Sequence, residues 1–301
     1  MTPKKRAALF LTCLFLFLLI ALSAIFYSQG YRIDFNPPAG GLKIVQTGGI
    51  FLKVEPKQAT VFVDEKLKKK TDFLFGTILI KNLLPGWHKI RVEKNGFHSW
   101  EKNLEIKEKE VTEAKNIILI PQNPKFTVLT QGIKNFSDFP ELKEIFPTST
   151  NATTSNSPYY LDESGYLFKN GEKLSEMSFK TLKISPNFQK LALIRDYEIR
   201  LLFIEPQSSQ PQRKANEQIY LTRFSKKIGE VFWYNPDYLL FNVGGEIKIT
   251  EIDNRDQLNI ADLISFKESE TENLKIFFDQ NNKKLYILNK GDFSVSEKLL
   301  P

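Results

Sequence analysis

The sequence predicts a protein that is all-β after one N-terminal transmembrane helix, with a small antiparallel β-sandwich followed by a propeller-like repeat of about four β-meanders. Three observations carry this prediction: an uninterrupted apolar run near the N-terminus, short alternating strands between turn residues, and a strand pattern that recurs along the second half. The 25 Phe residues of the 301-residue chain also favour half-buried strands.

Residues 1–6 are predicted as a basic cytoplasmic tail and residues 7–28 as a transmembrane anchor. The anchor segment contains no charged residue and is long enough to cross a bilayer core of about 30 Å. Because the positive residues precede the run, we expect a cytoplasmic N-terminus and an extracytoplasmic location for the rest of the single-pass chain.

Two other interpretations of this segment are weaker. A cleavable signal peptide needs a shorter apolar core and small residues at the cleavage site, whereas the candidate site has Leu22 at one of these positions. A lipoprotein would be modified at Cys13, which lies in the middle of the run. Cys13 is the only cysteine, so the exported part can form no intramolecular disulfide and has no thiolate for catalysis or metal binding.

Residues 29–48 are predicted as a stalk or lead-in strand because they contain the sequence PPAGG. From residue 49 to residue 121, alternating segments such as GIFLKVEP, ATVFVDE and HKIRVEK are separated by turn pairs, including Pro85-Gly86 and Asn95-Gly96. Short strands at this spacing, with no helical segment between them, predict the small antiparallel sandwich.

Residues 49–121 also resemble a PEGA domain, a small β-sandwich module of exported and membrane-anchored proteins. The resemblance implies a fold and a location, and four residues depart from its pattern: Lys57, Gln58, Glu65 and Asp72. It rests on four landmarks in the family's order: VEPKQA at 54–59, VFVDEK at 61–66, LPGWHKI at 84–90 and KNGF at 94–97.

The segment 83–101 contains both histidines, His88 and His98, and therefore raises the question of a metal or catalytic site. A metal site needs a third and usually a fourth ligand, and the sequence offers no third His and no Cys outside the anchor. We expect His88 to face the core together with Ile90, so that this segment has a structural role.

Residues 122–158 are predicted as a linker with a first irregular unit, and residues 159–301 as β-propeller-like repeats. Units that start at Leu182, Glu230 and Leu274 share the order strand, turn, strand, turn, strand, and they resemble WD40-like and TolB-like propeller blades. Because the segment is short for a closed ring, the sequence leaves open a small propeller, an open stack of sheets, and closure by oligomerisation.

The net charge of +7 includes one dense run, and its lysines are the predicted partner-binding residues: Lys66, Lys68, Lys69 and Lys70. Arg213 and Lys214, in the polar loop 205–217, are weaker candidates. A basic patch suits nucleic acid, anionic lipid or an anionic wall polymer, and the predicted topology excludes nucleic acid. The alternative is a solvated loop with no partner.

No catalytic residue, cofactor site or metal site is predicted, because no nucleophile elbow, phosphate-binding loop or zincin motif is present. The leading hypothesis is therefore a non-enzymatic, membrane-anchored scaffold of the cell envelope that contacts a protein or an anionic surface glycan. The alternatives are an accessory or sensory subunit of a membrane enzyme or transporter, a glycosidase-like enzyme with paired carboxylates, and a bare structural spacer.

Overall fold

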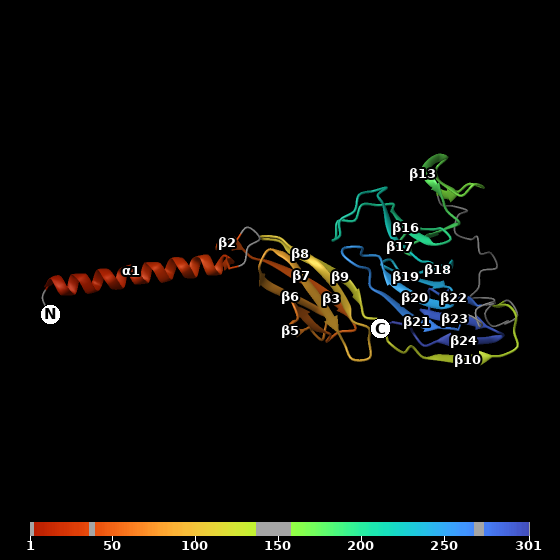
Figure 1. Cartoon of the computed structure of the whole chain (residues 1–301), viewed down its shortest axis with the longest axis horizontal. Helices are drawn as coiled ribbons and strands as arrows, with labels where there is room; N and C mark the ends of the chain where they lie inside the picture. Colours follow the sequence, from red (N-terminus) through yellow and green to blue (C-terminus); the bar gives the residue numbers. More distant parts are fainter. Residues whose placement is uncertain (1–2, 36–39, 137–157, 268–273, 301) are drawn as a thin grey trace.

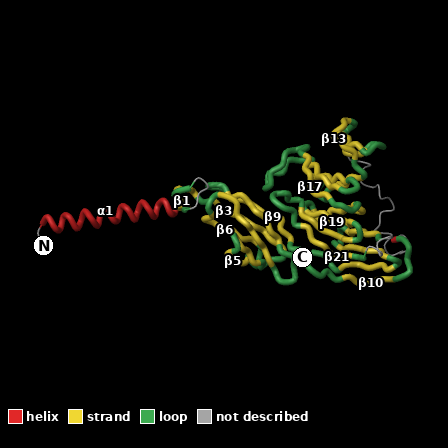
Figure 2. The backbone as a smooth tube through the Cα atoms, viewed as in Figure 1, coloured by secondary structure: helices red, strands yellow, loops and turns green. Residues whose placement is uncertain are grey.

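The computed structural model of the chain describes residues 3–35, 40–136, 158–267 and 274–300. One helix is followed only by strands, and all described strand pairs but one are antiparallel, as the sequence predicts. Figures 1 and 2 show the helix along the long axis of the molecule, then the sandwich, then a larger group of sheets.

The helix α1 (Pro3–Ser28) projects away from the β-sheets, and none of its residues is buried (Figure 1). It is long and apolar enough to cross a membrane. The hydroxyl groups of Thr12 and Ser23 each donate a hydrogen bond to the carbonyl four residues earlier, at 2.9 and 2.8 Å, so neither polar side chain interrupts the apolar surface.

Two sheets form the sandwich, and alternate residues of both sheets build one apolar core. The predicted alternation is correct here, since Val61 and Val63 are buried while Phe62 is not. One sheet contains β6 (Thr77–Leu83), β3 (Gly48–Glu55) and β9 (Val111–Ile118); the other contains β5 (Lys66–Lys70), β4 (Thr60–Val63), β7 (Gly86–Glu93) and β8 (Trp100–Ile106).

The pair β3–β9 is parallel, which differs from the predicted antiparallel sandwich. The chain leaves the edge strand β8, crosses to the opposite sheet through residues 107–110, and then runs alongside β3 in the same direction. Because such a pair joins segments about 60 residues apart, alternation within either strand does not reveal its direction.

Four sheets follow the sandwich in an arc, with β13 of the first sheet and β10 of the last far apart (Figure 1). The neighbouring inner strands β11 and β14, β14 and β18, and β18 and β22 contact each other. The sheets are β11 (Tyr159–Leu161), β12 (Tyr166–Lys169) and β13 (Glu172–Ser178); β14 (Thr181–Ile184), β15 (Lys190–Ile194), β16 (Glu198–Phe203) and β17 (Gln218–Arg223); β18 (Ile228–Asn235), β19 (Tyr238–Val243), β20 (Glu246–Glu251) and β21 (Ile260–Ser265); β22 (Lys275–Asp279), β23 (Lys284–Asn289) and β24 (Asp292–Ser296) with β10 (Phe126–Thr130).

The strand β10 lies within residues 122–158, the predicted linker and first irregular unit. It is the outermost strand of the last sheet, where it pairs with β24 at the other end of the chain. Phe126 faces Ser296 in this pairing. Residues 137–157 of the predicted linker lie outside the described residues.

The predicted repeat units correspond to the sheets, because each unit begins at the inner strand of a sheet, namely β14, β18 or β22. The turn after each inner strand is held by a polar side chain, as the sequence suggests. Ser185 accepts a hydrogen bond from the backbone of Lys190 at 2.9 Å. Asn235 and Asp279 each accept one from the backbone two residues later, at 2.8 and 2.9 Å.

The sandwich and the propeller-like sheets meet at a buried contact between β8 and the β20–β21 loop, which we call the domain joint. Lys102 has no exposed surface, and its Nζ lies 2.8 Å from Oε1 of Glu251. The same ammonium group donates to three backbone carbonyls of the loop at 2.5–2.9 Å, those of Asp253, Arg255 and Gln257.

The carboxylate of Glu251 is also fully engaged. Trp100 Nε1 donates to its Oε2 at 2.9 Å, and Asn259 Nδ2 donates to its Oε1 at 2.7 Å. Burial raises the pKa of Glu251, and the ammonium group of Lys102 opposes this rise. Because a buried charge without these partners would be costly, the domain joint fixes one orientation of the sandwich against the propeller-like sheets.

Candidate functional site

The predicted lysine cluster lies on the edge strand β5, which we call the lysine strand (Lys66–Lys70). The sequence leaves a solvated loop as the alternative for these residues, whereas they form a strand. Asp64 and Glu65 have φ angles of 51° and 61° and reverse the chain in two residues, so the lysines form the second strand of a hairpin. All five residues are exposed, and no strand of the described residues pairs with the outer edge of β5.

The acidic residues of the hairpin do not neutralise the lysine strand. Glu65 pairs with Lys89 and Arg91, each at 3.0 Å, and the hydrogen bond and charge of Lys89 are the main reasons why the pKa of Glu65 is lowered. Asp64 Oδ2 lies 2.7 Å from His88 Nδ1. Among the described residues, the ammonium groups of the lysine strand have no ion pair or hydrogen bond, namely those of Lys66, Lys68, Lys69 and Lys70.

The lysine strand leads into an exposed apolar turn that sequence reasoning missed. Phe73, Leu74 and Phe75, which we call the apolar turn, are each more than half exposed. Asp72 accepts the backbone N–H groups of Leu74 and Phe75 at 2.9 and 2.6 Å, and that of Thr77 at 2.6 Å. These donors, with Phe75 first, hold the pKa of Asp72 far below its ordinary value. The signal was the run FLF directly after Asp72 and before Gly76.

Arg213 and Lys214 are not part of this surface. Arg213 is half-buried: it pairs with Glu217 at 3.0 Å, donates to Asn254, and lies over the ring of Phe203. Its charge therefore serves contacts within the chain. Lys214 is exposed, and a role in partner binding stays a prediction for both residues.

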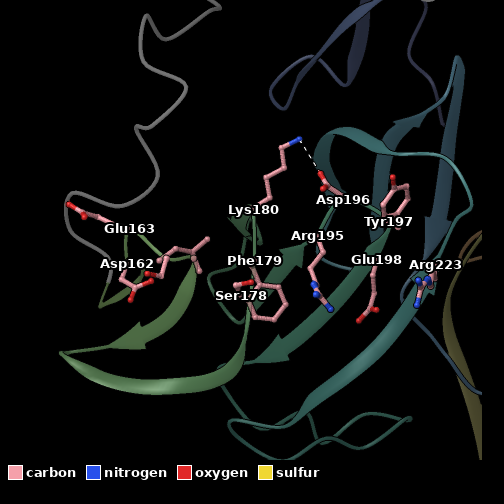
Figure 3. A pocket seen from close by; sticks show the side chains of 13 residues that line it. Asp162, Glu163, Ser178, Phe179, Lys180, Arg195, Asp196, Tyr197, Glu198 and Arg223 are labelled. Carbon is pink, nitrogen blue, oxygen red and sulfur yellow. Dashed lines mark ion pairs between the residues drawn. The ribbon is translucent and has the colours of Figure 1, made fainter.

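A second candidate site is a cleft of about 770 Å³ between the first and second sheets (Figure 3). The turn at 195–197, which joins β15 to β16, lines the cleft. Phe203 lies at the other end of the same two strands. Because Phe203 lies in a small pocket with Trp100 of the sandwich, the cleft faces away from the domain joint.

Charged side chains from both sheets line the cleft, and several are already paired. Lys180 lies 3.7 Å from Asp196, and Glu198 pairs with Arg200. Figure 3 shows Arg195 and Arg223 on either side of Glu198. Within the described part of the chain, these two guanidinium groups have no ion pair or hydrogen bond through their side chains.

The two histidines have separate structural surroundings. His88 is held through both ring nitrogens, by Asp64 and by the carbonyl oxygen of Leu84 at 2.7 Å. The backbone N–H of His98 donates to the carbonyl oxygen of Ile120, and its Nε2 is buried without a partner among the described residues. Trp100 is buried in the sandwich core. No three His, Cys, Asp or Glu side chains of the described residues are arranged to hold a metal.

No protein-family model matches the chain, and no curated protein matches its sequence. Among solved structures, the β-propeller domain of Myceliophteria thermophila Cps50 (Swd1) is 13% identical, with a TM-score of 0.33 over 70% of this chain and 67% of that one. Kluyveromyces lactis Hsv2 is 8% identical, with a TM-score of 0.29 over 81% and 71%. YCF48 from Cyanidioschyzon merolae is 12% identical, with a TM-score of 0.30 over 82% and 98%. Likenesses at these scores indicate no activity for this chain.

Proposed function

We propose that this protein is a membrane-anchored, non-enzymatic binding scaffold of the cell envelope whose lysine strand contacts an anionic partner. The observation that carries the proposal is the row of four ammonium groups that have no ion pair, on a sheet edge with no neighbouring strand, within the part of the chain that the structure describes. The partner is an acidic protein segment or an anionic surface glycan, since both present negative charges to such an edge.

Lysines on an edge strand also have a purely structural use, because they prevent pairing with other strands. That use does not explain the apolar turn, which exposes three consecutive apolar side chains beside the lysine strand. A surface built only to avoid association would not hold such a turn in place through Asp72. The combination of apolar contacts and uncompensated positive charge supports binding.

The proposal includes membership of the sandwich in the PEGA class and export of the domains. The two-residue turn at Asp64 and Glu65 stands where the PEGA-like landmark VFVDEK turns. Such modules belong to exported and membrane-anchored proteins, in agreement with the apolar helix α1 and the basic residues before it. In this arrangement, the domain joint holds the propeller-like sheets at a fixed angle to the anchored sandwich.

The test compares two variants that carry the same net charge. In the first, the lysine strand is neutralised (Lys66→Gln, Lys68→Gln, Lys69→Gln, Lys70→Gln). In the second, four other exposed lysines are neutralised (Lys53→Gln, Lys81→Gln, Lys107→Gln, Lys298→Gln). Each variant lowers the net charge from +7 to +3, since four positive charges are removed.

The full-length proteins are co-sedimented with isolated envelope glycan across a salt series and are crosslinked in membranes. We expect the first variant to lose about tenfold or more in binding, because each of its four exposed ion pairs with the partner contributes about 0.2–1 kcal/mol. The second variant should change little, because its lysines lie outside the proposed contact. Wild-type binding should weaken as salt rises. Equal losses in the two variants, or neither glycan binding nor a crosslinked partner at low salt, would refute the proposal.

The cleft favours a second candidate function, ligand sensing by an accessory subunit of a membrane enzyme or transporter. Arg195 and Arg223 suit a ligand with a carboxylate or phosphate group. Citrate and inorganic phosphate should then raise the unfolding temperature of the wild type but not that of an Arg195→Gln, Arg223→Gln variant. No rise in the wild type would remove this candidate.

A further inference from the structure

The segment between helix and sandwich is a two-stranded ribbon with one apolar face. The strands β1 (Tyr31–Asp34) and β2 (Lys43–Gln46) are antiparallel, and Ile33 lies directly opposite Ile44. Phe35 and Leu42 flank the strands and continue the same alternation. We call these four residues the ribbon face; their exposed fractions are 52% for Ile33, 73% for Phe35, 72% for Leu42 and 71% for Ile44.

The opposite side of the ribbon is different. Val45, which alternates with Ile44, is only 5% exposed. Arg32 lies opposite Val45 and Lys43 lies opposite Asp34, so this side also carries the charged residues. The apolar ribbon face therefore remains bare although it adjoins a packed side, and a contiguous apolar face of this kind marks a contact surface.

The ribbon is attached directly to the end of α1 (Figure 1). The carbonyl oxygen of Gly30 accepts the backbone N–H and the hydroxyl group of Thr47, both at 2.9 Å. Gln46 Nε2 donates to the carbonyl oxygen of Gln29 at 2.9 Å. These bonds place the ribbon beside the helix end and keep it near any membrane that the helix crosses.

The residues at the helix end are those typical of a bilayer interface. The guanidinium group of Arg32 lies over the ring of Tyr27 at 3.6 Å, and Phe26 and Tyr31 meet edge to face at 5.5 Å. Aromatic rings and basic side chains concentrate at the headgroup layer. At a rise of 1.5 Å per residue, the 26 residues of α1 span about 39 Å, which exceeds a hydrocarbon core of about 30 Å and brings its ends into the headgroup layers.

We propose that the ribbon face lies in the outer interfacial layer of the bilayer that α1 crosses, so that the chain contacts lipid through a strand ribbon as well as a helix. This inference rests on the proposed membrane anchor. Lipid is the occupant because the ribbon follows α1 in the chain with no folded domain between them, and hydrogen bonds hold it at the helix end. The ribbon then restricts how the sandwich tilts over the membrane.

The experiment uses single-cysteine variants of the full-length chain in phosphatidylcholine–phosphatidylglycerol vesicles. In a Cys13→Ser background, an environment-sensitive NBD label is placed on the ribbon face (Phe35→Cys or Ile44→Cys). The matched controls are the other side of the ribbon (Lys43→Cys) and an exposed apolar site on the sandwich (Leu79→Cys). Quenching is measured with lipids that carry a nitroxide close to the headgroup.

We expect blue-shifted emission and at least twofold stronger quenching at positions 35 and 44 than at 43 and 79. Equal quenching at all four positions would overturn the inference. A blue shift at 35 and 44 without lipid quenching would also overturn it, because the face would then be covered by protein.

The label on the native Cys13, in the middle of α1, separates the two proposals. Quenching of that label by lipids with a deep nitroxide, without quenching at 35 and 44, would refute the ribbon inference and leave the anchor intact. Absence of quenching at Cys13 as well would refute the anchor itself.

Discussion

The chain has two joints, the domain joint and the ribbon after the helix, and they differ in burial and in the kind of contact that each one makes. The domain joint buries an ion pair, with Lys102 fully enclosed and Glu251 bonded to Trp100 and Asn259. The ribbon is bonded to the helix end through the backbone of Thr47 and the side chains of Gln46 and Thr47, and it leaves its apolar face exposed. The orientation between the domains is therefore set inside the protein, whereas the orientation to the proposed membrane depends on what covers the ribbon.

The largest expected effect is loss of the anion at the domain joint. Glu251→Ala leaves the ammonium group of Lys102 buried without a counter-ion, and we expect a loss of about 3–5 kcal/mol in the free energy of unfolding. Urea denaturation of the full-length protein in detergent measures it. The matched control is Glu246→Ala, whose exposed carboxylate pairs with Lys248 on the same strand and should contribute less than about 1 kcal/mol. Equal losses would contradict the contrast between a buried joint and a surface pair.

Removal of both charges sharpens this result. The double variant Lys102→Met, Glu251→Leu should be less destabilised than Glu251→Ala, since no uncompensated charge remains in the joint. A double-mutant cycle with the corresponding single variants gives the coupling energy. A coupling energy of zero would show that the two side chains do not act as a pair.

A smaller effect is expected from the indole hydrogen bond. Trp100→Phe keeps an aromatic ring in the core but removes the donor to Glu251, at an expected cost of about 1–3 kcal/mol. Thermal unfolding measures the loss. If the same replacement has no effect in a Glu251→Ala background, the loss is specific to this bond; an undiminished loss there would assign it to packing alone.

At the ribbon, replacement of a charged residue should have a smaller effect still. Arg32→Gln removes the contact with the ring of Tyr27 and two hydrogen bonds to backbone carbonyls in a partly exposed setting. We expect less than about 1 kcal/mol in unfolding. Hydrogen exchange should nevertheless become faster at Gly30 and Thr47. A loss as large as that of Glu251→Ala would remove the distinction between the joints.

The smallest expected effects are changes of the free energy of unfolding with pH, and those due to Glu251 and Glu65 should have opposite signs. The pKa of Glu251 is raised above 4.5 by burial, so the folded state holds its proton more tightly. Relative to Glu251→Gln, wild-type stability should therefore fall as pH rises from 4.5 through the folded pKa. The pKa of exposed Glu65 is lowered, so its contribution is complete above 4.5 and is lost as pH falls through the folded value. Unfolding curves at several pH values test both signs, and slopes of the same sign would contradict this assignment.

Local pattern predicted much of the fold. Alternation identified the buried Val61 and Val63, and polar residues marked the turns after the inner strands. Local pattern did not predict which distant segments pair with each other. Alternation defines the two faces of a strand but not its neighbour, and therefore neither the parallel pair β3–β9 nor the union of β10 with β24 was visible.

The candidate site was predicted in part. The lysine run stood out as charge, but its strand conformation depended on the turn residues Asp64 and Glu65, which adopt positive φ. The apolar turn was missed because a short apolar run before a glycine resembles a core segment. Only the structure places it outside the core.

The sequence by itself determined the apolar helix, the alternation of the strands, the repeat and the concentration of lysines, because each depends on residues close together in the chain. The tertiary structure decided which charges are free. The residues that enclose Lys102 lie about 150 positions away, and the partners of Glu65 lie about 25 positions away. Whether a charge is neutralised depends on what the fold brings beside it, and for the lysine strand it brings no partner among the described residues.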